Sequence, residues 1–528
     1  MAVFARKASG LTREASLFDA FSYGFFDQAV GACIWAFTSF GLYVAPKGDL
    51  MIGILLGTIL GIAGAIVWGI LGASMPRSGG DYVYNSRIIH PVIGTVISVS
   101  TAWFVLIMWN GVLCGWVIYG LTHTLGLIGV SYEVIEWFWS FQGLIVSCII
   151  IQVISAVVTS FGWRKYAKFQ KLIMLVAMIG LVICGILLTV NGREQFISSW
   201  NATAAQYESI GYEELLSKVE ANGFPVQGGY ELFDSLALIT TSNYFTMYGY
   251  MIAFIGGEIK RPQRNIFLAQ LLAVVVPVIF ATWITFASLK TVGIEFLRAG
   301  AYIDNAGYIE GYNLPFAPIY TSAAAVLTDN VVLKFLIGFQ LALFSFMYIP
   351  VDYLASNRAM FAWGMDNIGP SFFTDVSPKF GTPMKNQLVI FVFSMITATL
   401  FSLYPELLFT FSVVVLETLT LFTVTGISGI IFPFVKKVRR IWDASPYKKW
   451  KLGPIPIVTI AGIVYVVFLL MIVYFYRALF PLEFLHPIWD PIYVSTFVFG
   501  GLWFAFWWNK RKKEGIDVLL AFKEIPPE

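Results

Sequence analysis

Charged residues are scarce in this chain, and their scarcity decides the class of protein. Only 12% of the 528 residues are Asp, Glu, Lys or Arg, while 58% are hydrophobic and 17% are aromatic. A water-soluble domain has no core large enough for so much apolar surface, so the composition excludes a soluble protein. The formal net charge of +3 is also too small to indicate a nucleic acid partner.

Cysteine and histidine are rare as well. The four cysteines fall in apolar segments without metal-ligand spacing, and the three histidines form no cluster. This pattern predicts neither disulfides nor a zinc site. The sequence also lacks a nucleotide-binding loop and a nucleophile with a paired base. We therefore expect no enzyme activity, no catalytic residue, no metal and no cofactor.

Long hydrophobic runs are what the chain has instead. Runs near ~20 apolar residues are typical of transmembrane helices. The sequence predicts an all-α integral membrane protein with twelve such spans, at residues 18–44, 50–73, 91–120, 138–160, 171–190, 235–257, 266–289, 333–355, 386–404, 407–434, 455–476 and 488–508.

The basic residues predict the orientation of these spans. If the N-terminus is cytoplasmic, most of the 34 Lys and Arg residues lie on the cytoplasmic side, as the positive-inside rule requires. We therefore expect a multi-pass protein of the plasma membrane with both termini in the cytoplasm. Few basic residues then remain outside, namely Lys47, Arg193, Lys218, Lys290, Arg298, Lys334 and Arg477.

Polar and small residues interrupt two of the spans. In the first span, Asp27 and Gln28 precede Gly31 near the middle of the run. A charge at that depth costs at least ~2.5–3.5 kcal/mol, and such residues usually serve a function. The sixth span carries the polar run 240–243 and then Gly249 in its outer and middle part. Both spans are therefore predicted to be discontinuous, unless these residues only help the helices to pack.

Each interrupted span begins a group of five. An odd number of spans inverts the second copy of a duplicated unit, and inverted repeats with discontinuous helices at matching positions are typical of transporters. We predict a ten-helix core over residues 1–434, with repeats at about 15–190 and 235–434 and an outside loop at 191–234. Residues 435–528 then contain a cytoplasmic loop, two peripheral spans and a cytoplasmic tail.

Three loop motifs carry a specific resemblance. MPRSGGDYVY at residues 75–84 follows the second span, GEIKRPQRNI at 257–266 follows the sixth, and SNRAMFA at 356–362 follows the eighth. With these motifs in this order, the chain resembles the amino acid–polyamine–organocation (APC) superfamily of permeases. The resemblance implies the LeuT-type fold, in which a 5+5 inverted repeat is joined by two peripheral helices. It also implies transport of amino acids or amines, often with protons or by exchange.

The resemblance places a binding site at the two interruptions. In such permeases the first helix breaks at a Gly-small-Gly sequence whose backbone N–H groups hold the substrate carboxylate. Gly31, Ala32 and Cys33 match that place, so a cysteine stands where the family has its second glycine. Broken helices also expose unpaired N–H and C=O groups, which suit a zwitterion. The matching stretch of the sixth span, where the expected glycine is absent, is Tyr244, Phe245, Thr246, Met247 and Tyr248.

Four residues are candidates for ion coupling. Lys171 matches a lysine of proton-coupled permeases, although it equally suits a basic residue that snorkels to the surface. Asp27, one turn before Gly31, is a candidate proton carrier, a partner for a cationic substrate, or a carboxylate held by neighbouring N–H groups. Ser345 is the best-placed hydroxyl for Na⁺, the alternative coupling ion. Glu417, in the middle of the tenth span, is a candidate for gating or proton binding.

The sequence as a whole predicts a secondary active transporter of amino acids or related amines that is coupled to protons and works by alternating access. Arg77 and Glu258 lie in two of the cytoplasmic motifs, and we expect them to contribute to an inner gate. An amino acid/amine exchanger and a non-transporting membrane sensor on the same scaffold are the alternative interpretations. The expected partners are a small-molecule substrate, H⁺ or else Na⁺, and the lipid bilayer, with no nucleic acid.

Overall fold

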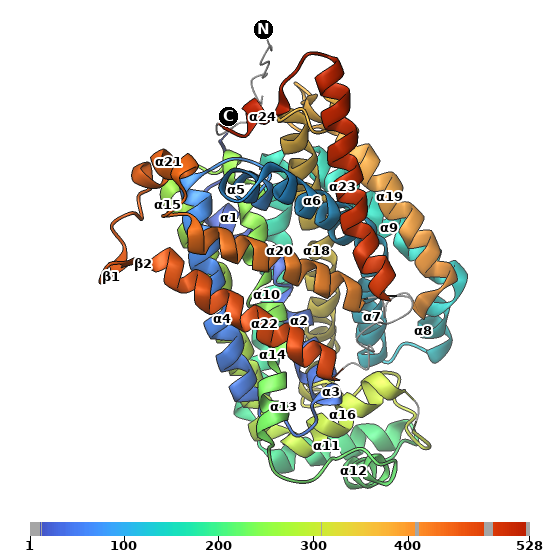
Figure 1. The fold of residues 1–528 in the computed structure, drawn as a ribbon. Helices are drawn as coiled ribbons and strands as arrows, with labels where there is room; N and C mark the ends of the chain where they lie inside the picture. The colour runs from blue at the N-terminus through green and yellow to red at the C-terminus, as the bar shows by residue number, and fades with distance from the viewer. Residues whose placement is uncertain (1–10, 12, 308, 407–410, 480–488, 524–528) are drawn as a thin grey trace.

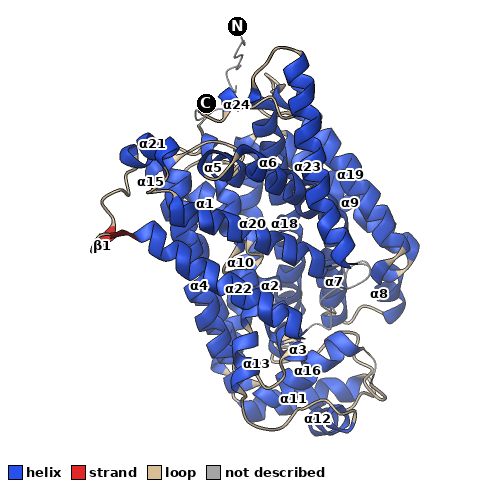
Figure 2. Ribbon diagram, in the orientation of Figure 1, coloured by secondary structure: helices blue, strands red, loops and turns tan. Residues whose placement is uncertain are grey.

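The computed structural model describes residues 11, 13–307, 309–406, 411–479 and 489–523. Helices dominate this part of the chain, and a two-stranded antiparallel hairpin, β1 (Lys451–Leu452) and β2 (Ile455–Pro456), accompanies them (Figure 2). The starts of two predicted spans, residues 407–410 and 488, lie outside the described residues, as do Arg6 and Lys7 of the N-terminal basic group.

Ten helices of the described residues are long and apolar enough to cross a membrane. The protein is therefore an integral, multi-pass membrane protein. These helices are α4 (Leu50–Ser74), the continuous stretch α6 (Pro91–Thr101), η1 (Ala102–Met108) and α7 (Trp109–Leu127), then α9 (Phe141–Ser160), α10 (Trp163–Val190), α15 (Pro262–Thr291), α18 (Val331–Met365), α19 (Met384–Leu403), α20 (Phe411–Ile431), α22 (Ile457–Leu479) and α23 (Trp489–Lys513).

The first predicted span is broken, as its polar residues predict. It consists of α1 (Leu17–Asp27), α2 (Val30–Thr38) and α3 (Phe40–Val44). A capping box at Ser16 starts α1, because Ser16 and Asp19 each accept a hydrogen bond from the other's backbone N–H. At the break, Ala29 has φ 39° and ψ 50°. This left-handed conformation costs a non-glycine residue about 1–2 kcal/mol, so the packing around the break must hold it in place.

The sixth predicted span is also broken. It consists of α13 (Leu232–Ala237), α14 (Ile239–Ser242) and three 3₁₀ turns, η2 (Asn243–Phe245), η3 (Tyr248–Ala253) and η4 (Gly256–Glu258). Regular α-helical hydrogen bonding therefore ends within the polar run. Glycines on α4 let this irregular backbone pack closely against α4. A Cβ at Gly57 would lie 2.7 Å from Ser242 Oγ, and one at Gly61 would lie 2.7 Å from the Thr246 carbonyl oxygen.

The molecule has two opposite ends (Figure 1). One, here called the α24 end, carries the short helices α5 (Asp81–Ile88), α21 (Arg439–Ala444) and α24 (Val518–Ala521). The other, the α16 end, carries α11 (Arg193–Gln206), α12 (Tyr212–Ala221) and α16 (Ile294–Ala306). The chain thus places its inter-span helices in two separate layers, one at each end of the bundle.

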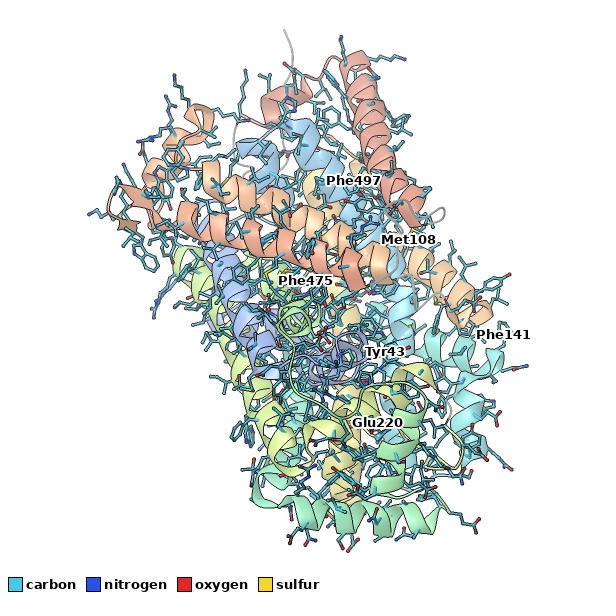
Figure 3. The ribbon with its side chains drawn as sticks, turned by 60° about the horizontal axis from the view of Figure 1, so that its bottom comes forward. Tyr43, Met108, Phe141, Glu220, Phe475 and Phe497 are labelled. Atoms are coloured by element: carbon cyan, nitrogen blue, oxygen red, sulfur yellow. The ribbon has the colours of Figure 1, made fainter. Side chains whose placement is uncertain are left out.

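The α16 end is a folded cap. Figure 3 turns this end toward the viewer, with Glu220 of α12 and Tyr43 of α3 labelled on it. Tyr43 stacks on Phe224 with ring centroids 6.0 Å apart, which ties the end of the first broken span to the cap. Helix α12 is amphipathic, with Leu215 and Val219 buried and Glu220 exposed.

Two helices extend beyond their apolar runs. Helix α10 begins at Trp163 rather than at residue 171, so Lys171 lies two turns inside the helix. Helix α18 continues to Met365, so the motif at 356–362 is helical and buried instead of forming a loop. Both extensions contain polar residues with partners in the fold, such as Arg164 with Glu14 and Asn357 with Gln387, which a hydropathy pattern does not report.

The apolar segment 315–327 is mostly buried. Its helical part is α17 (Tyr320–Ala325), in which every residue is buried. The remaining short elements are α8 (Tyr132–Trp139), η5 (Ser371–Thr374) and η7 (Lys436–Val438).

Candidate functional site

A cavity lies where the two broken spans meet. It contains about 540 Å³ of space between atoms, including its open side. Five segments contribute to it: α2, the η1–α7 stretch, the η2–η3 segment, α18 and α20. Its lining is mainly apolar and aromatic, with hydroxyl groups as the polar part and without a charged side chain: Ala29, Cys33, Val105, Trp109, Leu113, Trp116, Tyr244, Tyr248, Ser345, Tyr348 and Val414.

The structure brings four of the predicted site residues to this lining. Cys33, Tyr244 and Tyr248 were predicted as substrate contacts, and Ser345 as an ion ligand. Gly31, Ala32, Phe245, Thr246 and Met247 lie in the same two segments but outside the lining.

Sequence reasoning missed the remaining lining residues. Trp109 and Trp116 are seven residues apart on one helix, which is a weak signal for a shared face. Val105, Leu113 and Val414 carry no signal, since apolar residues are expected anywhere in a span.

Two polar side chains tie the breaks together. Gln28 accepts a hydrogen bond from the Tyr248 N–H at 3.1 Å and donates to the Ala273 carbonyl oxygen at 3.2 Å. Asp27 Oδ2 accepts one from the Met251 N–H at 3.4 Å. The irregular backbone of the sixth segment therefore finds acceptors on the first, so each break stabilises the other.

The N-terminus of α2 borders the cavity, since Ala29 and Cys33 lie in its lining. Its N-cap, Ala29, provides no side-chain cap, and the N–H groups of Gly31 and Ala32 donate to none of the described residues. Uncapped N–H groups and the helix dipole together favour an anion at this position. The Gly31 carbonyl accepts a hydrogen bond from the Tyr320 hydroxyl at 3.0 Å, and that hydroxyl accepts one from Gln340 Nε2 at 2.7 Å.

A pair of carboxylates lies near the break of the first span, outside the cavity lining. Asp27 and Asp352 are fully buried, and their charges act on each other. Both oxygens of Asp352 and one oxygen of Asp27 have no hydrogen-bond partner among the described residues. The hydroxyls of Tyr166 and Tyr250, which interact electrostatically with both carboxyls, have no such partner either. Unpaired buried carboxylates are costly, so this group suits a bound proton or cation.

The other two coupling candidates lie away from the cavity lining. The Lys171 ammonium is 2.6 Å from Asp19 Oδ1, and its side chain is 43% exposed. Glu417 on α20 accepts a hydrogen bond from Ser100 at 2.5 Å and lies beside a second space, which shares Trp109 and Val414 with the central cavity.

Aromatic residues cover the cavity toward the α16 end. Trp35 stacks on Tyr119, with centroids 4.3 Å apart, and meets the cavity residue Trp116 edge-on at 5.8 Å. Asp304 of α16 holds this cover by accepting hydrogen bonds from Trp35 at 2.7 Å, from Tyr119 at 2.6 Å and from Ser39. Burial raises the pKa of the Asp304 carboxyl, and these three hydrogen bonds oppose the rise.

Buried ion pairs lie on the side opposite this aromatic cover, toward the α24 end. Arg358 of α18 donates two hydrogen bonds to Glu258, at 2.6 and 3.1 Å, and both side chains are buried. Arg87 of α5 pairs with Asp366 at 2.6 Å and is equally buried. The gating candidate Glu258 therefore bonds to Arg358. The other gating candidate, Arg77, donates to the Pro76 carbonyl oxygen at 2.9 Å.

The described residues contain no group of three or more His, Cys, Asp or Glu side chains that could hold a metal ion.

Ten membrane-length helices around this cavity define the class: an integral, multi-pass membrane protein with a mainly apolar and aromatic cavity between its two broken spans. A family model described as "Amino acid permease" matches residues 22–502, almost the whole chain. The protein therefore belongs to the amino acid permease family of the APC superfamily, which confirms the resemblance. The match extends through α22 and ends within α23, two helices that carry none of the loop motifs. A comparison with curated proteins found no match.

Proposed function

We propose that this protein is a secondary active transporter of amino acids that works by alternating access in the plasma membrane. The two discontinuous segments, 17–44 and 232–258, complete twelve spans with the ten membrane-length helices. Residues 15–190 and 235–434 form the inverted repeats of the LeuT-type core, with 191–234 outside and the peripheral part in 435–528. We propose that the α24 end and both termini face the cytoplasm, since the basic residues favour that orientation.

One observation carries the proposal, namely the uncapped N-terminus of α2 beside the cavity. We propose that its N–H groups hold the substrate carboxylate, as the family's Gly-small-Gly break does at Gly31, Ala32 and Cys33. The hydroxyl groups of Ser345 and Tyr244 lie in the same lining and suit the ammonium group. Because the lining has no charged side chain, a substrate with a neutral, apolar side chain fits better than a polyamine.

Thermal stabilisation of the purified protein by amino acids and polyamines tests this proposal. A ligand that binds only the native state stabilises it by about 2.7 kcal/mol at one hundred times its Kd. We expect neutral amino acids with apolar side chains to raise the melting temperature and polyamines to leave it unchanged. If polyamines stabilise the protein and amino acids do not, the proposed substrate class is wrong. Stabilisation without flux in vesicles would support the sensor interpretation.

We propose that coupling uses a proton carried by the Asp27 and Asp352 pair. Asp27 interacts directly with the second broken helix through Met251, so a change in its charge acts on the break itself. Lys171, with its ammonium bound to Asp19, is the weaker candidate for this role. Glu417 and Ser345 are left as candidates for a gating carboxylate and a Na⁺ ligand.

The Asp27→Asn variant is expected to lose uphill uptake. An amide keeps an acceptor for the Met251 N–H but carries no exchangeable charge, so accumulation driven by an inward proton gradient should fall at least tenfold. Lys171→Ala is the matched comparison and should retain accumulation. Uptake in proteoliposomes with an imposed pH gradient measures both variants. Wild-type accumulation by Asp27→Asn would refute the assignment, and uptake that requires internal substrate would indicate an exchanger.

A further inference from the structure

Another hollow lies near α21, away from the central cavity and from the space beside Glu417. It contains about 1030 Å³ of space, including its open side. Three segments form it: the leader to α1, the end of α4 with its following loop, and the start of α15. Ser74 links this region to α21, because its hydroxyl is 2.7 Å from that of Ser445. The lining contains four arginines, Arg13, Arg77, Arg261 and Arg264, together with Ser74, Pro76, Pro262 and Gln263.

The positive charge of these arginines is not neutralised within the hollow, because the described residues that line it include no Asp or Glu. Within the described residues, Arg13, Arg261 and Arg264 take part in no ion pair or side-chain hydrogen bond. Two nearby carboxylates are already bound elsewhere. Glu14 pairs with Arg164 at 2.7 Å, and Glu258 pairs with Arg358. The side chains of Arg13, Arg261 and Arg264 are exposed, so water and salt screen part of their repulsion, and an anion that enters the concave space would be attracted by all three.

The backbone adds to this positive potential. Helix α15 runs for 30 residues from Pro262, and its N-terminus opens into the hollow. Its N-cap, Arg261, provides no side-chain cap and has a left-handed backbone with φ 48°. Pro262 has no N–H, and the Arg264 N–H donates to the Arg261 carbonyl oxygen. The helix start therefore adds its dipole and the Gln263 N–H to the space lined by the guanidinium groups. Arginine forks and helix N-termini both match the oxygen geometry of a phosphate group.

The three segments are also fixed to one another. The Ala15 N–H donates to the Glu258 carbonyl oxygen at 2.9 Å, and the Lys260 N–H donates to the Ala15 carbonyl oxygen at 2.8 Å. The leader to α1 is therefore held against the loop that precedes α15. A ligand in the hollow would contact both of them and the end of α4.

We propose that this hollow binds a phosphate group at the membrane surface, held by Arg13, Arg261 and Arg264. The phosphate belongs to an anionic phospholipid headgroup or to a soluble phosphate compound. Basic pockets at the cytoplasmic membrane surface can hold anionic headgroups, and the site would face that surface in the proposed orientation. The inference does not depend on which molecule the central cavity transports.

Two charge-matched double variants test the site. Arg261→Gln with Arg264→Gln removes two charges from the hollow. Lys512→Gln with Lys513→Gln removes two exposed charges at the end of α23, outside the lining. Each purified protein is measured in nanodiscs of phosphatidylcholine, with and without phosphatidylglycerol, and separately in detergent with inorganic pyrophosphate. The readouts are the melting temperature and bound lipid counted by native mass spectrometry.

For the wild-type protein and the lysine variant, we expect the same rise in melting temperature with one of the two probes. For the arginine variant, affinity for that probe should fall at least fivefold. A response to phosphatidylglycerol alone assigns the site to a lipid headgroup, and a response to pyrophosphate alone assigns it to a soluble phosphate. Equal responses of the two double variants, or no response of the wild type to either probe, would overturn the proposal. Arg13→Gln, on a different segment, repeats the test if the arginine variant does not fold.

Discussion

Replacing Glu258 with glutamine is expected to abolish transport. Glu258 accepts two hydrogen bonds from Arg358, and the two side chains are 2% and 1% exposed. Removing one charge of a buried ion pair costs about 3–5 kcal/mol, because the other charge stays in a poorly solvated place. In the proposed orientation this pair closes the cytoplasmic side of the cavity. The closed state should therefore lose more than a hundredfold of its population relative to the inward-open state.

The matched control for this variant is Glu231→Gln. Glu231 binds Lys47 at the same distance of 2.6 Å, but its side chain is 55% exposed. Exposed ion pairs contribute only about 0–1 kcal/mol, so the control should transport normally. Uptake in proteoliposomes and the melting temperature compare the two. If both variants transport and melt alike, the ion pair does not close the cavity.

The second large effect is expected at Gly31. A Cβ at this position would overlap the Gln340 amide oxygen and would lie 2.8 Å from Cδ2 of Phe344. Gln340 cannot withdraw freely, since it donates to the Tyr320 hydroxyl that in turn donates to the Gly31 carbonyl oxygen. Gly31→Ala should therefore cost about 1–3 kcal/mol of stability, as overpacked sites do. It should also displace the N–H groups of α2, and substrate affinity should fall at least tenfold.

Gly192→Ala is the control for Gly31→Ala. Gly192 also begins a helix, but a Cβ there would meet nothing within 4 Å. Its effect should be a few tenths of a kcal/mol. Thermal unfolding and substrate titration of the two variants measure the difference. A Gly31→Ala protein with wild-type affinity would show that the start of α2 does not contact the substrate.

The sequence could predict where the chain would break because the signal is local. Asp27, Gln28 and Gly31 are close together in an otherwise apolar run, and α1 ends at Asp27. The same holds for α14, which ends at Ser242 within the polar run. In both places a residue that is costly in lipid lies where the helix stops.

The partners of buried charges could not be predicted in this way. Arg358 and Glu258 are 100 residues apart, and each looks like a loop residue at the edge of its apolar run. Only the packed structure shows that they neutralise each other and that α18 continues past the pair. The residues that line the cavity could not be predicted from the sequence for a related reason. Trp109 and Tyr348 lie in apolar spans, where the face that meets the cavity depends on helix rotation.

Lys171 shows the limit of a motif match. Its position suggests a buried ammonium that replaces an ion, but α10 begins eight residues earlier than the apolar run. The side chain therefore reaches the base of α1 and pairs with Asp19, while it stays 43% exposed. By contrast, Asp352 gives little signal in the sequence, yet the fold buries it within electrostatic range of Asp27, with no hydrogen-bond partner among the described residues.

The central claim is that the substrate occupies the cavity between the two broken helices, and Cys33 allows it to be measured. Cys33 lines that cavity, whereas Cys114, Cys148 and Cys184 do not. In a variant that keeps Cys33 as its only cysteine, a small thiol reagent should label this residue, and the amino acid that stabilises the protein should slow labelling at least fivefold. Cys33→Ser in that background should remain unlabelled. An unchanged labelling rate at saturating substrate would contradict the account.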